Sequence, residues 1–140
     1  MNNYKFDEIS VGLEQHFSVT VDADKLDKFL EISGDTNPLH TDREYSKSKG
    51  FADRVVYGML TSSFYSALVG VYLPGLYSVL QGVDIQFSKP VYIEDKLKIS
   101  GKVSYINEAY KQIEIKAFIA NQNNEKVSKA TIKVGVMDEW

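Results

Sequence analysis

The chain has 140 residues but no cysteine, only two histidines and three prolines. Without cysteine there is no disulfide bond, no thiolate nucleophile and no metal site built on sulfur ligands. The remaining metal-binding residue types form no convincing cluster along the chain either. We therefore expect a protein that works without a metal and without a cofactor.

Long basic runs are also absent, and the formal net charge is -3. A nucleic-acid partner requires a concentrated lysine and arginine surface, so none is expected. The first residues, Met1 to Lys5, lead into polar sequence without the apolar core of a signal peptide, which favours a cytoplasmic location. The length and the 44% share of hydrophobic residues are typical of one soluble globular domain.

Charge is missing altogether from residues 58–73. A transmembrane helix needs about 20 apolar residues, whereas this run is shorter and contains several serines and glycines. A helix without a charged face is better explained by burial inside a protein, so we predict a buried helix and no membrane partner. Pro74-Gly75 is expected to end it.

Apolar residues repeat at every second position after Gly75, which is the pattern of half-buried antiparallel strands. The alternation covers residues 97–105, 113–119 and 130–136, and turn-forming residues lie at 107–108 and 122–124. Residues 79–87 and 16–21 are further predicted strands. A sheet with one apolar face can curl around the uncharged helix and cover it, which predicts an α+β domain.

A first helix is predicted between Asp22, a typical N-cap residue, and Gly34, a typical C-terminal stop. Asp35 and His40 follow directly, on a segment interrupted by proline. A carboxylate and an imidazole held close together can share one water molecule and move protons on and off it. Taken alone, Asp35 would be a turn residue and His40 a structural histidine. Asp42 is expected to cap a second short helix.

The surrounding residues form a longer pattern that resembles a known family. It runs Ser33-Gly34-Asp35-x-Asn37-Pro38-Leu39-His40-x-Asp42, then Phe51, then Val55-Val56-x-Gly58-Met59, and later Phe87-x-x-Pro90-Val91-x-x-x-Asp95. This pattern resembles the MaoC-type (R)-specific enoyl-CoA hydratases over nearly the whole chain. The resemblance implies a single hot-dog domain over residues 1–140, in which an antiparallel sheet wraps around one long helix.

The resemblance also implies an enzyme that hydrates trans-2-enoyl thioesters, or dehydrates the products. Its catalytic pair falls on Asp35 and His40, and its oxyanion donor, a backbone N–H, falls on Gly58. Which of the pair acts as base stays open. A serine that lines the substrate site in some members falls on Ser66. Tyr57 departs from the family, which commonly has histidine there, and we assign Tyr57 to the substrate pocket as a packing aromatic.

Acyl-CoA or acyl-carrier-protein thioesters are the substrates that the resemblance implies, and a homodimer or higher homo-oligomer is the expected assembly. Two other functions stay open. One is a hot-dog thioesterase, which is disfavoured because residues 58–73 lack the Glu or Asp that many of those enzymes place on the long helix. The other is an inactive acyl-thioester-binding domain, which the presence of both Asp35 and His40 disfavours.

Overall fold

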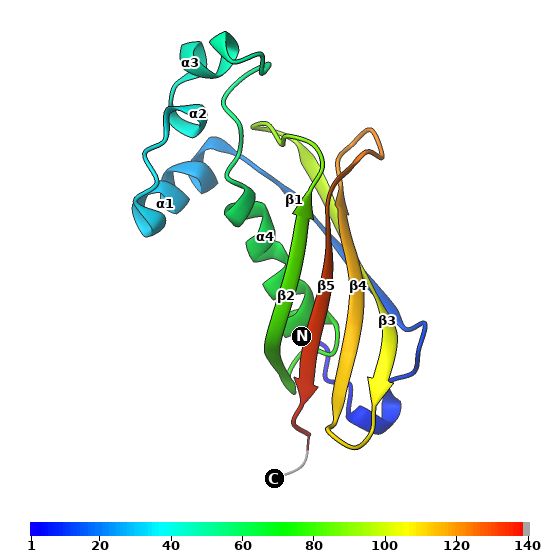
Figure 1. Cartoon of the computed structure of the whole chain (residues 1–140). Coiled ribbons are helices and arrows are strands. Elements are labelled where there is room, and N and C mark those ends of the chain that lie inside the picture. Colours follow the sequence, from blue (N-terminus) through cyan, green and yellow to red (C-terminus); the bar gives the residue numbers. More distant parts are fainter. Residues whose placement is uncertain (139–140) are drawn as a thin grey trace.

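The computed structural model describes residues 1–138, and its centre is a five-stranded antiparallel sheet with one helix lying across it (Figure 1). The strand order is β1-β3-β4-β5-β2, so that β1 and β2 form the two edges. The strands are β1 (Glu14–Thr20), β2 (Ser78–Phe87), β3 (Lys96–Asn107), β4 (Gln112–Ala120) and β5 (Lys126–Val136). These bounds confirm the strands predicted from the alternation of apolar residues.

The central helix α4 (Gly58–Ala67) continues into a π-helical segment, η2 (Leu68–Tyr72), before Pro74 and Gly75 end it. It packs very closely on the sheet, because a Cβ atom added at Gly101 of β3 would lie only 2.7 Å from Leu68 Cδ2. The core lies between this helix and the inner face of the sheet. Its largest fully buried side chains include Tyr65, Leu68, Leu73, Leu97, Ile99, Ile113, Ile115, Ile119 and Ile132.

Burial of the central helix is less complete than the sequence predicts. Met59, Ser63 and Ser66, spaced three and four residues apart, form one exposed stripe along α4. Small hydroxyl side chains carry no charge but can be exposed to solvent. The absence of charge from this run therefore did not reveal that one face of the helix is left uncovered by this chain. Among residues 1–138, no helix is long and apolar enough to cross a membrane.

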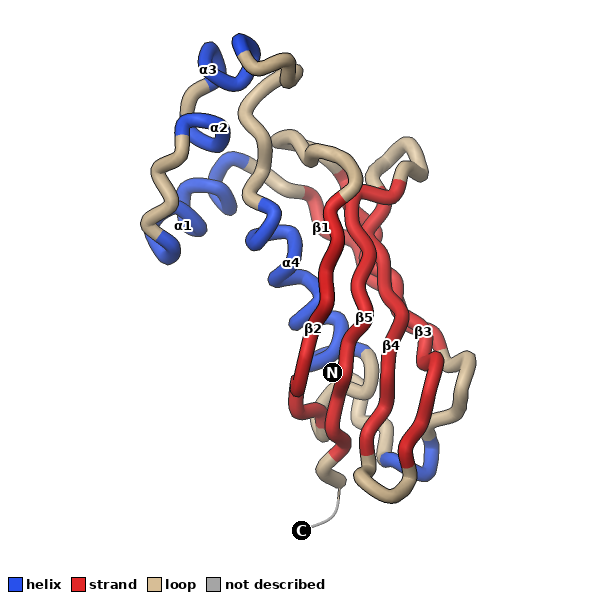
Figure 2. The backbone as a smooth tube through the Cα atoms, viewed as in Figure 1, coloured by secondary structure: helices blue, strands red, loops and turns tan. Residues whose placement is uncertain are grey.

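Three short helices form a separate lobe beyond one end of the sheet (Figure 2). They are α1 (Ala23–Ser33), α2 (Pro38–Thr41) and α3 (Arg43–Ser48), preceded in the chain by a 3₁₀ turn, η1 (Phe6–Glu8). As predicted, the Asp22 side chain caps α1 by accepting from the Lys25 N–H at 2.9 Å, and Gly34 ends α1 with a φ of 69°. This left-handed conformation suits glycine, and it turns the chain toward Asp35.

Two helices, rather than the single one expected, follow that turn. Asn37 accepts from the Leu39 N–H at 2.9 Å and Pro38 occupies the first turn of α2, which therefore begins as a capped helix. Asp42 caps α3, as predicted, by accepting from the Tyr45 N–H at 3.1 Å. Consequently His40 sits on one turn of helix and not on an irregular loop.

Candidate active site

Asp35 and His40 are brought together between the lobe and the start of α4. Their closest atoms, Asp35 Oδ2 and His40 Nε2, lie 4.0 Å apart. The Asp35 side chain is 47% exposed and that of His40 is 16% exposed, so solvent reaches the pair from the aspartate side. One water molecule fits within hydrogen-bond distance of both atoms, at about 2.6–3.2 Å from each.

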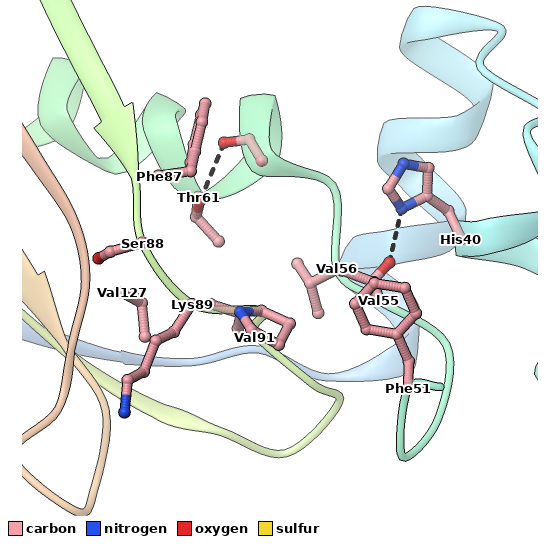
Figure 3. A pocket seen from close by; sticks show the side chains of 12 residues that line it. His40, Phe51, Val55, Val56, Thr61, Phe87, Ser88, Lys89, Val91 and Val127 are labelled. Carbon is pink, nitrogen blue, oxygen red and sulfur yellow. Dashed lines mark hydrogen bonds between the residues drawn. The ribbon is translucent and has the colours of Figure 1, made fainter. Parts of the chain in front are cut away.

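The other nitrogen of His40 fixes the tautomer of the ring. His40 Nδ1 lies 2.6 Å from the carbonyl oxygen of Val55, a contact that Figure 3 shows. A carbonyl oxygen only accepts, so Nδ1 carries a hydrogen and donates it. In the neutral ring, Nε2 is then the nitrogen without a hydrogen, and it faces Asp35 as a proton acceptor.

The two carboxylate oxygens of Asp35 also have different partners. Oδ1 accepts from the Asn37 N–H at 3.1 Å and so belongs to the turn. Oδ2 is the oxygen that faces His40. The short turn therefore orients the aspartate and leaves one oxygen for chemistry. Asn37 stabilises this turn, because its N–H donates to Asp35 Oδ1 and its side-chain oxygen accepts from the Leu39 N–H.

Gly58, the first residue of α4, supplies the third element of the site. Among residues 1–138, the Gly58 N–H has no hydrogen-bond acceptor. The side chain of Tyr57, the N-cap residue, forms no capping hydrogen bond. A free N–H at a helix N-terminus attracts a negatively charged oxygen, because the helix dipole adds to the hydrogen bond.

Two clefts meet at this point. One, of about 320 Å³, is lined mainly by apolar side chains including Phe51, Val56, Val91 and Val127 (Figure 3). The other, of about 370 Å³, is lined by residues of α1, the following turn, α2, the start of α4 and the end of β2: Phe29, Ser33, Asp35, His40, Tyr57, Gly58, Met59 and Phe87. His40, Gly58 and Phe87 line both clefts. The candidate acid–base pair and the free amide therefore stand where the clefts join.

Tyr57 lines the second cleft but is only 3% exposed. Burial raises the pKa of its hydroxyl, and the negative charge of Asp35 raises that pKa further. The hydroxyl donates to the backbone carbonyl oxygen of Asp35 at 2.8 Å, so it has the partner that a buried tyrosine needs. Ser66 is exposed and lines neither cleft, and its assignment to substrate binding stays a prediction.

Several residues of the site were not found from the sequence. The Val55 carbonyl is a backbone group, and the residue type at that position does not predict its role. Phe51 and Phe87 were noted as parts of the family pattern but not as cleft walls, and Phe29 and Thr61 were not considered for the site. In residues 1–138 no three histidine, aspartate or glutamate side chains are grouped closely enough to hold a metal ion.

Comparisons with known proteins identify the family and the fold. An (R)-specific enoyl-CoA hydratase of Aeromonas caviae is 32% identical over 100 residues, which cover 71% of this chain and 75% of that enzyme. A mitochondrial 3-hydroxyacyl-[acyl-carrier-protein] dehydratase of Arabidopsis thaliana is 41% identical over 69 residues, covering 49% of this chain and 40% of that protein.

The structure of R-hydratase PhaJ1 from Pseudomonas aeruginosa superposes with a TM-score of 0.91 at 26% identity. The superposition covers 98% of this chain and 88% of that one, which confirms the hot-dog fold. Residues 7–126 match the family described as MaoC like domain. The chain therefore belongs to the MaoC-like domain family, whose relatives named here are hydro-lyases.

Proposed function

We propose that the protein adds water to trans-2-enoyl thioesters to give (R)-3-hydroxyacyl thioesters, and catalyses the reverse dehydration with the same residues. The observation that carries this proposal is the 4.0 Å separation of Asp35 Oδ2 and His40 Nε2 beside the free Gly58 N–H. In the reaction a hydroxyl group is added at Cβ and a proton at Cα. After the hydroxyl group adds and before Cα is protonated, negative charge develops on the thioester oxygen.

Water is a poor nucleophile, so its proton must be removed while the new C–O bond forms. A water molecule between Asp35 and His40 donates one hydrogen to Oδ2 and the other to Nε2, since both atoms are acceptors. Its lone pair is then directed toward Cβ. The group that takes this proton from the water then returns a proton to Cα, so one hydrogen of the water stays in the new hydroxyl group and the other ends on Cα. The role of base is not assigned to one member of the pair.

The Gly58 N–H is proposed to donate to the thioester oxygen as it becomes an enolate. This donor is in place before the reaction starts, which is why such groups lower the barrier effectively. The acyl chain and the pantetheine arm leave the reacting carbons in different directions, and the two clefts offer one path for each. The reaction as proposed uses neither a metal nor a cofactor.

A spectrophotometric assay of the wild-type protein with crotonyl-CoA tests this function. We expect loss of absorbance from the conjugated enoyl thioester without release of free thiol. Thiol release would indicate a thioesterase, and binding without either change would indicate an acyl-thioester-binding domain. Repeating the assay with a crotonyl carrier protein shows which thioester is preferred. A cytoplasmic location stays a prediction from the sequence.

We also propose that two copies associate through the β2 edges of their sheets. Within residues 1–138, strand β2 pairs with β5 alone, so its other edge has unpaired backbone groups. Leu80, Val83 and Phe87 of this strand are 40–55% exposed, and Met59 at the start of α4 is 66% exposed. A second copy related by a two-fold axis can pair with this edge and cover these side chains.

Val83→Lys is expected to convert this dimer into a monomer, because it places a charge in each copy among the apolar side chains that the interface would cover. Asp84→Lys, on the opposite face of the same strand, is the matched control and should stay dimeric. Light scattering coupled to size-exclusion chromatography measures the mass of each variant. A monomeric wild-type protein, or a dimeric Val83→Lys variant, would contradict the proposed interface.

A further inference from the structure

Tyr57 contacts both members of the candidate catalytic pair. Its hydroxyl donates to the carbonyl oxygen of Asp35 at 2.8 Å. Its ring stacks on the His40 imidazole, with ring centroids 4.2 Å apart and planes inclined by 29°. The next residue in the chain is Gly58, so the backbone of Tyr57 leads directly into the free N–H. One buried side chain therefore adjoins all three parts of the site.

The other hydrogen bonds of Asp35 are local. Its N–H donates to the Ser33 hydroxyl at 3.2 Å, and its Oδ1 accepts from the Asn37 N–H at 3.1 Å. Both bonds stay within a five-residue turn that is exposed throughout. The Tyr57 hydroxyl bridges 22 positions in sequence and ties this turn to the start of the central helix.

Tyr57 is itself held in place. The Phe29 ring packs against it at 4.9 Å between centroids, inclined by 49°. A side chain that is 3% exposed and contacts aromatic rings of Phe29 and His40 has little freedom to choose another rotamer. Because burial raises the pKa of Tyr57, its hydroxyl keeps its hydrogen and donates at neutral and mildly alkaline pH.

We infer that Tyr57 is a positioning residue, which sets the distance and orientation of the Asp35 carboxylate and the His40 imidazole relative to the Gly58 N–H. This inference rests on the proposed function and deepens it, because it assigns the tyrosine to the alignment of the pair and not to contact with the reacting atoms. Correct alignment lets one water molecule meet both acceptors while the thioester oxygen meets the amide.

Tyr57→Phe tests the inference, because it removes the hydroxyl and keeps the ring stack on His40. We expect kcat to fall about 3- to 10-fold, the range for one neutral hydrogen bond, while KM stays within about twofold. In an Asp35→Asn background, the same substitution should cause no further fall in kcat, because the carboxylate that it positions is gone. Wild-type kcat in Tyr57→Phe, or an equal fall in both backgrounds, would overturn the inference.

Tyr65→Phe is the matched control. Tyr65 lies on α4, is 1% exposed, and shares a 2.8 Å hydrogen bond with the Ser128 hydroxyl, but it lines neither cleft. Burial raises the pKa of Tyr65 to about 12, so its hydroxyl is also un-ionised during the assay. We expect Tyr65→Phe to lower Tm and to leave kcat unchanged. This separates the effect of losing a buried hydroxyl from the effect of misaligning the pair.

A measurement without substrate separates failure of this inference from failure of the proposed function. The Thr36 amide shares its peptide group with the Asp35 carbonyl, so Tyr57→Phe should shift the Thr36 amide resonance in a ¹H–¹⁵N spectrum. Tyr57→Leu should also shift the ring resonances of His40, while those of His16, exposed on β1, stay in place. If wild-type protein hydrates no enoyl thioester, the proposed function fails. If these resonances do not move, the positioning role fails.

Discussion

Replacing Asp35 by asparagine or His40 by glutamine is expected to lower kcat for enoyl-CoA hydration by about 10²–10⁴-fold, the usual contribution of one acid–base group. Asp35→Asn keeps the oxygen that accepts from the Asn37 N–H, so the turn should fold normally. Its new amide nitrogen replaces Oδ2, and so removes the oxygen that accepts from the water molecule in the proposed reaction. His40→Gln removes the imidazole nitrogen Nε2, which accepts from the water molecule in the proposed reaction.

Two variants of the same chemical type serve as controls. Asp42→Asn changes a neighbouring aspartate whose task is to cap α3, and asparagine is an equally good cap. His16→Gln changes the other histidine, which is exposed on β1. We expect both controls to have wild-type kcat, and all four variants to have wild-type circular dichroism spectra. Wild-type turnover in Asp35→Asn or His40→Gln would remove the pair from the mechanism.

The candidate pair could be singled out in the sequence because catalysis restricts residue types as well as positions, although its role in catalysis stays a prediction. An aspartate and a histidine in the pattern Asp-x-Asn-Pro-x-His are unusual enough to be noticed among ordinary residues. The strands could be predicted from the sequence as well, because burial of one sheet face imposes a strict two-residue period. Leu97, Ile99 and Val103 follow that period and are all buried.

The features that were missed depend on groups or shapes that residue types do not specify. The Val55 carbonyl fixes the His40 tautomer, but any residue at position 55 would offer a carbonyl. The α2 helix did have a signal in Asn37-Pro38, a cap followed by a proline at the first helical position. The exposed stripe of α4 had none, because Ser63 and Ser66 suit buried and exposed helix faces alike.

Tyr57 illustrates how a departure from a family pattern can be interpreted once coordinates are at hand. From the sequence it was a departure from the family pattern beside Gly58, and it was assigned to the substrate pocket as a packing aromatic. In the structure its ring stacks on His40 and its hydroxyl reaches the Asp35 backbone, two contacts that need an aromatic ring with a donor at its far end. Replacement of the common histidine is therefore compatible with an ordered site.

Gly58→Pro is expected to lower kcat by about 10²–10³-fold, the effect of losing one oxyanion donor. Proline has no N–H, and it is well tolerated at the first position of a helix, where the N–H has no partner within the helix. The preceding residue, Tyr57, has a φ of -54° and a ψ of 125°, which is the extended conformation that proline prefers before it. The substitution therefore removes the proposed donor with little change to the backbone.

Gly58→Ala separates loss of the donor from the added bulk. Alanine keeps the N–H, but its Cβ would lie 3.0 Å from Phe87 Cε1. The Phe87 side chain is 55% exposed and can rotate away, so we expect a smaller fall in kcat than in Gly58→Pro. The ratio of the two kcat values then reports the contribution of the N–H itself. Equal kcat values in the two variants would mean that the thioester oxygen develops its charge elsewhere, and that Asp35 and His40 act without this amide.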